Sequence, residues 1–245
     1  MTGLTPLRNW GAVVNAERIK LVTVRAPLWA TGAAAALSLG IAALRAATSY
    51  GPLTVPAAVL GVAVFGVPVL MVVAAMTVTA EYRTGLIHTT LMAAPDRAAV
   101  LCAKAVVAAA FSAAAAAVMT IGAVLVARAV GPGMWRAAAA MALYAALAAV
   151  LGVGVAALLR HTAGAVTVLL LWPLLAEPLL ANLPGQAARI GPYLPFANMF
   201  RFLDVSWLFP AYHQRWGELG SLGYFTAVVA VVFVVAVGTM NRRDA

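Results

Sequence analysis

The sequence predicts an all-α protein, a single domain of residues 1–245 in which six helices cross a membrane. Only 9% of its residues are charged and 64% are hydrophobic, whereas about a quarter of the residues of a soluble domain are charged. A helix needs ~20 apolar residues to cross ~30 Å of hydrocarbon. Six runs meet this requirement, at residues 26–47, 56–79, 105–127, 137–159, 163–181 and 221–239.

Residues 7–24, before the first span, predict a basic amphipathic helix that lies in the headgroup plane. Its apolar face comprises Leu7, Trp10, Val13, Val14, Leu21 and Val24. Glu17 falls within that face, and two interpretations stay open. It either reaches water and pairs with Lys20, three residues on, or meets Arg83 or Arg97 where the helix packs on the next cytoplasmic segment.

Residues 80–97, which follow the second span, are the densest polar stretch of the chain. Within them, Leu86, Ile87 and Leu91 recur at about helical spacing, and Pro95 ends the pattern. The stretch therefore predicts a short amphipathic helix between the second and third spans.

Two spans carry residues that are unusual inside a membrane. Pro68 in the second span and Pro173 in the fifth remove backbone donors and bend their helices, either beside a pathway or for packing. Glu177, about one turn from the end of the fifth span, is either an interfacial carboxylate that reaches water or a pathway group.

Residues 182–220 hold eight of the 20 aromatic residues and four prolines, a composition that predicts short helices dipping into the outer leaflet.

The distribution of basic residues predicts the orientation. With the N-terminus inside the cell, cytoplasmic segments hold ten of the 16 lysines and arginines, including those before the first span. We therefore expect a multi-pass protein of the cytoplasmic membrane with both termini in the cytoplasm. The net charge of +9 does not indicate nucleic-acid binding, because the basic residues lie at span ends rather than on one soluble face.

The sequence contains no motif for catalysis. Its histidines, His88, His161 and His213, fall on different loops, and neither a His-Glu-x-x-His nor a Cys/His cluster is present. A phosphate-binding Gly-x-x-x-x-Gly-Lys-[Ser/Thr] loop and a Gly-x-Ser-x-Gly elbow are also absent. We expect the chain not to be an enzyme and to hold no metal or cofactor of its own.

Three features resemble the membrane subunits, or permeases, of ABC exporters of the type-2 class. The first is a Glu-x-x-x-Gly step from Glu81 to Gly85, followed by the short helix and a proline. The second is residues 15–25, NAERIKLVTVR, directly before the first span. The third is the aromatic segment before the sixth span. The resemblance implies an elbow helix at 7–24, a cytoplasmic coupling loop at 80–99 and outer re-entrant helices within 182–220.

The same resemblance implies the function of an ATP-driven exporter. A separate cytosolic ABC ATPase would bind ATP and Mg²⁺ and dock on the coupling residues Glu81, Tyr82, Arg83, Thr84, Gly85, Leu86, Ile87 and Leu91. Glu17 and Lys20 would form the contact of the elbow helix. A second permease subunit, identical or homologous, would complete a path near Pro68, Pro173 and Glu177. Because the spans carry almost no charge, the expected substrate is hydrophobic or amphipathic, such as a drug-like molecule or a lipid.

Two other functions stay open. A proton-coupled carrier would need ionisable groups in its spans, and Glu177 is the candidate. Alternatively, the chain is a membrane assembly or sensor protein that transports nothing. An ATPase that binds the chain would distinguish the exporter from both.

Overall fold

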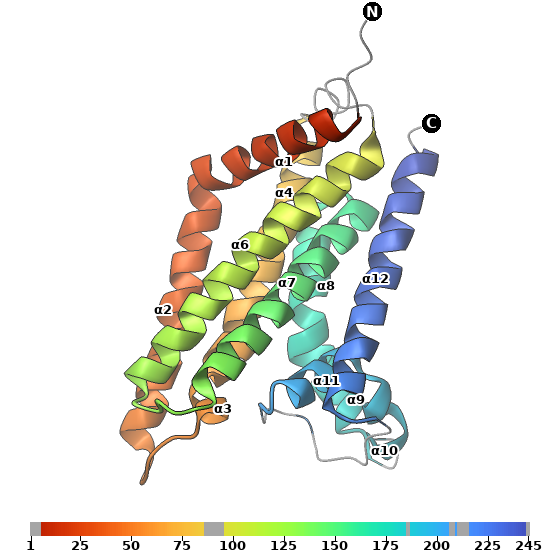
Figure 1. The fold of residues 1–245 in the computed structure, drawn as a ribbon. Coiled ribbons are helices and arrows are strands. Elements are labelled where there is room, and N and C mark those ends of the chain that lie inside the picture. Colours follow the sequence, from red (N-terminus) through yellow and green to blue (C-terminus); the bar gives the residue numbers. More distant parts are fainter. Residues whose placement is uncertain (1–5, 86–95, 185–186, 206–208, 210–215, 244–245) are drawn as a thin grey trace, which may run out of the picture.

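The computed structural model describes residues 6–85, 96–184, 187–205, 209 and 216–243, and all regular elements of these residues are helical. Six helices are long and apolar enough to cross a membrane, which confirms the prediction of an all-α chain with six candidate spans (Figure 1). They comprise Arg25–Thr48, Val62–Thr84, Arg97–Val126, Met134–Leu159, Thr162–Ala181 and Glu218–Met240.

Short helical segments precede, interrupt and connect the spans. In chain order the elements are α1 (Pro6–Thr23), α2 (Arg25–Thr48), α3 (Val55–Ala58), η1 (Val62–Gly66), α4 (Val67–Thr84), α6 (Arg97–Val126), α7 (Met134–Leu159), α8 (Thr162–Leu171), η2 (Trp172–Ala176), α9 (Glu177–Ala181), α10 (Ala187–Ile190), η3 (Gly191–Tyr193), α11 (Pro195–Phe202) and α12 (Glu218–Arg243). Of these, η1 and η2 are single π-helical turns and η3 is a 3₁₀ turn.

α1 lies across one end of the bundle, and α12 finishes at the same end (Figure 1). We call this the terminal end, and the opposite end, where α3, α9, α10 and α11 lie, the loop end. The change of direction between α1 and α2 occurs at Val24, which has extended backbone angles. One non-helical residue thus separates a helix lying across the bundle from the first span.

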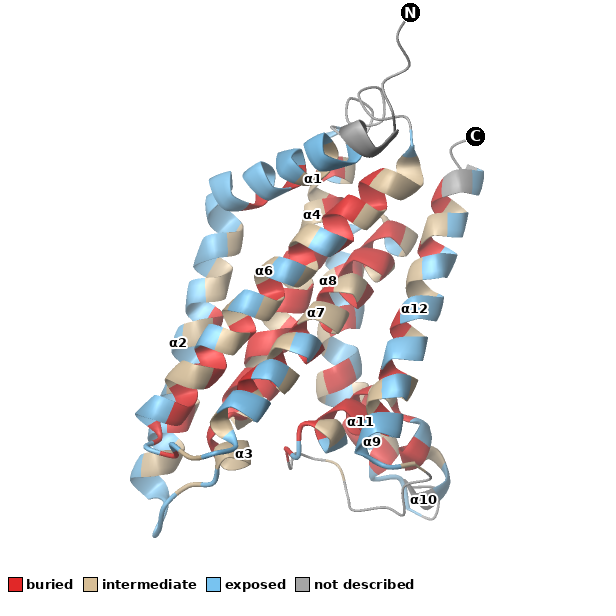
Figure 2. Ribbon diagram, viewed as in Figure 1, coloured by how far each residue is buried: buried red, intermediate tan, exposed pale blue. Residues whose placement is uncertain are grey.

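The core lies along α4 and α7, the two spans that are most buried within the chain (Figure 2). Small residues bring these helices together: even an alanine side chain at Gly152 of α7 would overlap the backbone carbonyl oxygen of Met71 on α4. Such close approach is typical of helix packing in membranes, where lipid supplies no hydrophobic driving force between helices.

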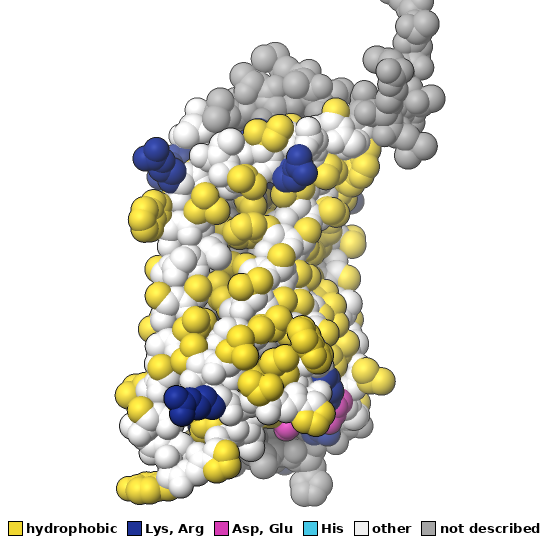
Figure 3. All heavy atoms as spheres, turned by 60° about the vertical axis from the view of Figure 1, so that its left-hand side comes forward, with side chains coloured by type: hydrophobic (Ala, Val, Ile, Leu, Met, Phe, Trp, Pro, Cys, Tyr) yellow, Lys and Arg dark blue, Asp and Glu magenta, His cyan; other side chains and the backbone are white. Residues whose placement is uncertain are grey.

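The face of the bundle drawn in Figure 3 is apolar along its middle. Figure 3 shows one face, on which hydrophobic side chains cover the middle and the lysine and arginine side chains lie near the two ends. α2 and α12 contribute many exposed apolar residues, including Leu44, Val231 and Val234. This distribution is that of a multi-pass membrane protein, with its apolar side chains facing lipid and its charges at the interfaces.

The second and third spans differ most from their predicted bounds. The second was predicted at 56–79 and the third at 105–127, but α4 continues to Thr84 and α6 begins at Arg97. The Asp96 carboxylate caps α6 by accepting a hydrogen bond from the Ala99 amide at 3.0 Å. The hydropathy pattern placed the end of the second span before Glu81 and the start of the third after Lys104. Both helices continue past these residues, whose charges are paired with each other.

Each of the second and fifth spans contains a π-turn directly before a proline. The Val67 amide donates to the Val62 carbonyl five residues back, ahead of Pro68. The Glu177 amide donates to the Trp172 carbonyl in the same way, ahead of Pro178. A proline ring clashes with the carbonyl four residues before it, and the wider π-turn relieves that clash. The bend predicted at Pro68 is therefore a local widening of the helix.

Candidate functional site

Four charged side chains meet where α1, α4 and α6 come together at the terminal end. Glu17 and Lys20 lie one turn apart on α1, so they share a face of that helix. Glu81 lies in the last turn of α4, and Lys104 lies about two turns into α6. We call these four residues the ion cluster.

Lys104 lies at the centre of the ion cluster. Its Nζ is 2.7 Å from Glu17 Oε2 and 2.7 Å from Glu81 Oε1, and it donates a third hydrogen bond to the Thr77 carbonyl at 3.3 Å. The Lys104 side chain is only 2% exposed. All three donors of this buried ammonium group therefore have an acceptor, which the burial of a charge requires.

Lys20 joins the same two carboxylates from the solvent side. Its Nζ lies 2.9 Å from Glu17 Oε1 and 2.8 Å from Glu81 Oε1, and its side chain is 47% exposed. Partial burial opposes the charged form of Lys20, but the hydrogen bonds to Glu81 and Glu17 outweigh it, so the pKa is raised above its usual value of 10.5. Two lysines and two glutamates make the ion cluster neutral as a whole.

The ion cluster decides between the two interpretations of Glu17. The carboxylate is buried, and it accepts hydrogen bonds from both Lys20 and Lys104. The predicted pairing with Lys20 is confirmed, but the interpretation that Glu17 reaches water is wrong, because the side chain is enclosed between helices. The partner of Glu17 on the neighbouring helices is Lys104 of α6, and not Arg83 or Arg97, the two partners that we expected from the sequence.

Two arginines next to the ion cluster join further helices at the terminal end. The Arg160 guanidinium, where α7 ends, lies 5.3 Å from the centre of the Tyr82 ring on α4, a cation–π distance. Arg97, the first residue of α6, donates to the Met240 carbonyl of α12 at 3.4 Å. The last turn of α4 thus contacts α1, α6 and α7, and α6 contacts α12.

The remaining predicted coupling residues follow the ion cluster along the chain. Arg83 and Thr84 are exposed in the last turn of α4. Gly85 ends the helix with φ +72°, a left-handed conformation that glycine adopts without a steric penalty. The other three predicted coupling residues, Leu86, Ile87 and Leu91, lie outside the described residues, as does the short helix predicted for them.

Glu177 is fully buried at the loop end and joins the fifth span to α11. Its Oε1 accepts a hydrogen bond from Trp172 Nε1 at 2.8 Å. Its Oε2 accepts from the backbone amides of Phe196 at 2.9 Å and Ala197 at 3.1 Å, in the first turn of α11. These amides lack partners within the helix, and a carboxylate there also interacts favourably with the helix dipole. The interpretation that Glu177 reaches water is wrong, because its side chain is 0% exposed.

The two prolines of the predicted path are both buried, in different surroundings. Pro173 lies in η2 and, with Met71 of α4, lines a cavity between the helices. Pro68 lies in the first turn of α4, next to η1, and is not among the described residues that line this cavity. The fifth span packs against the second, and the place of both prolines beside a path stays a prediction.

Sequence reasoning missed Lys104, which was counted only as a basic residue at a membrane edge. A signal was present, since Glu81 and Lys104 are the charged residues nearest to the apolar parts of two consecutive antiparallel spans. Such residues lie at one end of the bundle and at similar depth. Opposite charges there predict an ion pair.

A comparison with known proteins finds no family model, no curated protein and no solved structure that matches this chain. Among the described residues, no group of three or more His, Cys, Asp or Glu side chains lies together as metal ligands would.

Proposed function

We propose that this chain is the membrane subunit of an ATP-driven ABC exporter of the type-2 class. The order of its elements supports the proposal: a helix across one end, six spans, a polar loop after the second span and short helices before the sixth. In this proposal α1 is the elbow helix, the segment after Gly85 carries the coupling helix, and α10, η3 and α11 form the outer re-entrant segment. The terminal end faces the cytoplasm, as the distribution of basic residues favours.

The observation that carries the proposal is the ion cluster at the end of α4. A partner that presses on the loop after Gly85 moves the last turn of α4 directly, because no spacer separates the loop from the helix. Buried charges interact more strongly than exposed ones. Buried Lys104, which pairs with both Glu81 and Glu17, therefore passes that movement from α4 to α6 and to α1.

The composition of the spans favours a hydrophobic or amphipathic substrate, which the exporter moves out across the cytoplasmic membrane. Two permease subunits, identical or homologous, enclose the path in this proposal, and two cytosolic ATPases bind ATP and Mg²⁺. The contacts of Glu177 favour an exporter over a proton-coupled carrier. Its Oε1 accepts a hydrogen bond from Trp172 and its Oε2 accepts two from the first turn of α11, so the carboxylate has an anchoring role.

The proposal is tested by purifying the chain from its native membranes after mild cross-linking and identifying bound proteins by mass spectrometry. We expect an ATPase with a phosphate-binding loop. Arg83→Glu, which reverses an exposed charge beside the loop and leaves the ion cluster intact, should lower the amount of bound ATPase several-fold. Arg242→Glu is the matched control, since it reverses an exposed charge in the last turn of α12.

Recovery of the chain without any ATPase would overturn the proposal and favour the assembly or sensor alternative. An ATPase whose binding is equally reduced by both variants would contradict docking at the end of α4. Insertion into the membrane, measured by the yield of monodisperse protein, should be unchanged in both variants.

A further inference from the structure

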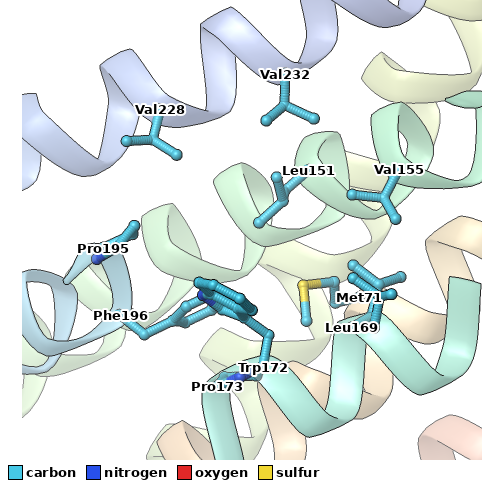
Figure 4. Close-up of a pocket in the computed structure, with 11 residues that line it drawn as sticks. Met71, Leu151, Val155, Leu169, Trp172, Pro173, Pro195, Phe196, Val228 and Val232 are labelled. Carbon is cyan, nitrogen blue, oxygen red and sulfur yellow. The ribbon is translucent and has the colours of Figure 1, made fainter. Parts of the chain in front are cut away.

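A cavity of about 250 Å³ lies between α4, α7, α8 and α12, and the start of α11 closes its loop end (Figure 4). The side chains that line it are all apolar. In Figure 4, Val228 and Val232 of α12 face Met71, Leu151 and Leu169 across the cavity. These elements, together with η2, which carries Trp172 and Pro173, thus line a space within the membrane-spanning part of the bundle.

The cavity connects the lipid-facing surface with the interior of the bundle. Val168 and Trp172 line it and are 44% and 45% exposed, so its entrance lies on the outer face of the fifth span. Leu151 and Leu169 also line it, although they are only 8% and 3% exposed. A molecule that enters beside Trp172 therefore reaches residues that face no lipid.

The chemistry of the lining determines the occupant. Water requires two to four polar partners to stay in a cavity. Among the described lining residues the polar side-chain group is the Trp172 indole N–H, which already donates to Glu177. An empty space would forfeit dispersion contacts with its lining. A dry cavity of about 150 Å³ is already large enough to bind benzene. The abundant molecules at this depth that can fill the space are lipid hydrocarbon chains.

We propose that the cavity binds one acyl chain of a bilayer phospholipid, which enters between α8 and α12. The site is preformed, because the Glu177 carboxylate holds the Trp172 indole on one wall and the Phe196 backbone at the loop end. It requires only the six-span bundle in a bilayer. The proposal therefore does not depend on the exporter function.

Photolabelling in lipid nanodiscs tests this site, with a phosphatidylglycerol that carries a diazirine in the middle of one acyl chain. We expect labelled peptides at Leu151 and Leu169, which line the cavity and are only 8% and 3% exposed. Val232→Trp fills the cavity and should lower labelling at these two residues about tenfold, equivalent to ~1.4 kcal/mol of binding free energy. Val231→Trp adds the same side chain at the neighbouring, 63% exposed position of α12 and should leave that labelling unchanged.

Labelling confined to lipid-facing residues such as Val231 would overturn the proposal. Labelling at Leu151 that persists in full in Val232→Trp would also overturn it. If Val232→Trp does not yield monodisperse protein, the distribution of label in the unmodified chain decides, because Leu151 lies between the helices and is only 8% exposed. Neither result depends on whether an ATPase binds to the chain.

Discussion

Replacing Lys104 with methionine tests the central part of the ion cluster. The substitution leaves the carboxylates of Glu17 and Glu81 buried with only Lys20 between them. Removing one partner of a buried ion pair costs ~3–5 kcal/mol, because the remaining charge stays uncompensated. We expect Lys104→Met to lower the free energy of unfolding by about this amount. Lys20→Met removes a half-exposed partner of the same carboxylates and should cost at most ~1 kcal/mol.

A second substitution separates charge compensation from simple loss of packing. Replacing a whole buried pair with apolar residues is often neutral or stabilising. Glu81→Leu combined with Lys104→Met should therefore recover most of the stability that Lys104→Met alone loses. The interaction energy from the double-mutant cycle should reach ~1–3 kcal/mol, as found for residues that share one ionic network.

The measurement is reversible unfolding in detergent micelles by increasing amounts of sodium dodecyl sulfate, followed by tryptophan fluorescence, with the six tryptophans as probes. Equal and small effects of the two lysine substitutions would refute the assignment of Lys104 as the buried centre. Strictly additive effects of Glu81→Leu and Lys104→Met would refute the ion pair itself.

Two further predictions concern helix packing and pH. Gly152→Ala should destabilise the bundle by ~1–3 kcal/mol in the same assay, because its Cβ would overlap the Met71 backbone. Gly40→Ala, with no atom within 4 Å of its Cβ, should be neutral or stabilising. Equal effects of the two substitutions would contradict the close approach of α4 and α7. The raised pKa of Lys20 means that its stabilising contribution is complete below pH 10.5 and is lost as the pH rises through the folded-state pKa. The stability difference between wild type and Lys20→Met should accordingly shrink above that pH, and a difference that grows there would contradict the ion pairs of Lys20.

Hydropathy predicted the number and approximate positions of the spans, because a run of ~20 apolar residues is a local property of the sequence. It misplaced the ends of α4 and α6, since it treats every charge as a boundary. Glu81 and Lys104 continue their helices because each neutralises the other across the interface. That compensation is a property of the folded bundle and is not visible in either segment alone.

The same distinction applies to the candidate sites. The pairing of Glu17 with Lys20 follows from their separation of three residues and was predicted. The role of Glu177 was not predictable from its own surroundings, because two of its three hydrogen-bond partners are backbone amides at positions 196 and 197. Which amides are available depends on where α11 begins, and α11 packs against α12 only once the bundle has formed.

The positions of the ion cluster and of η1 determine how α4 can move. From Val67 to Thr84 the helix has 18 residues, which corresponds to ~27 Å of regular structure. Its terminal end is held by ion pairs, and its middle lies against α7, where Gly152 leaves no room for a side chain. In the proposed exporter we therefore expect a push at Thr84 to move α4 and α7 together. The first irregular backbone along this span from the terminal end is the π-turn η1, and we infer that the second span bends there.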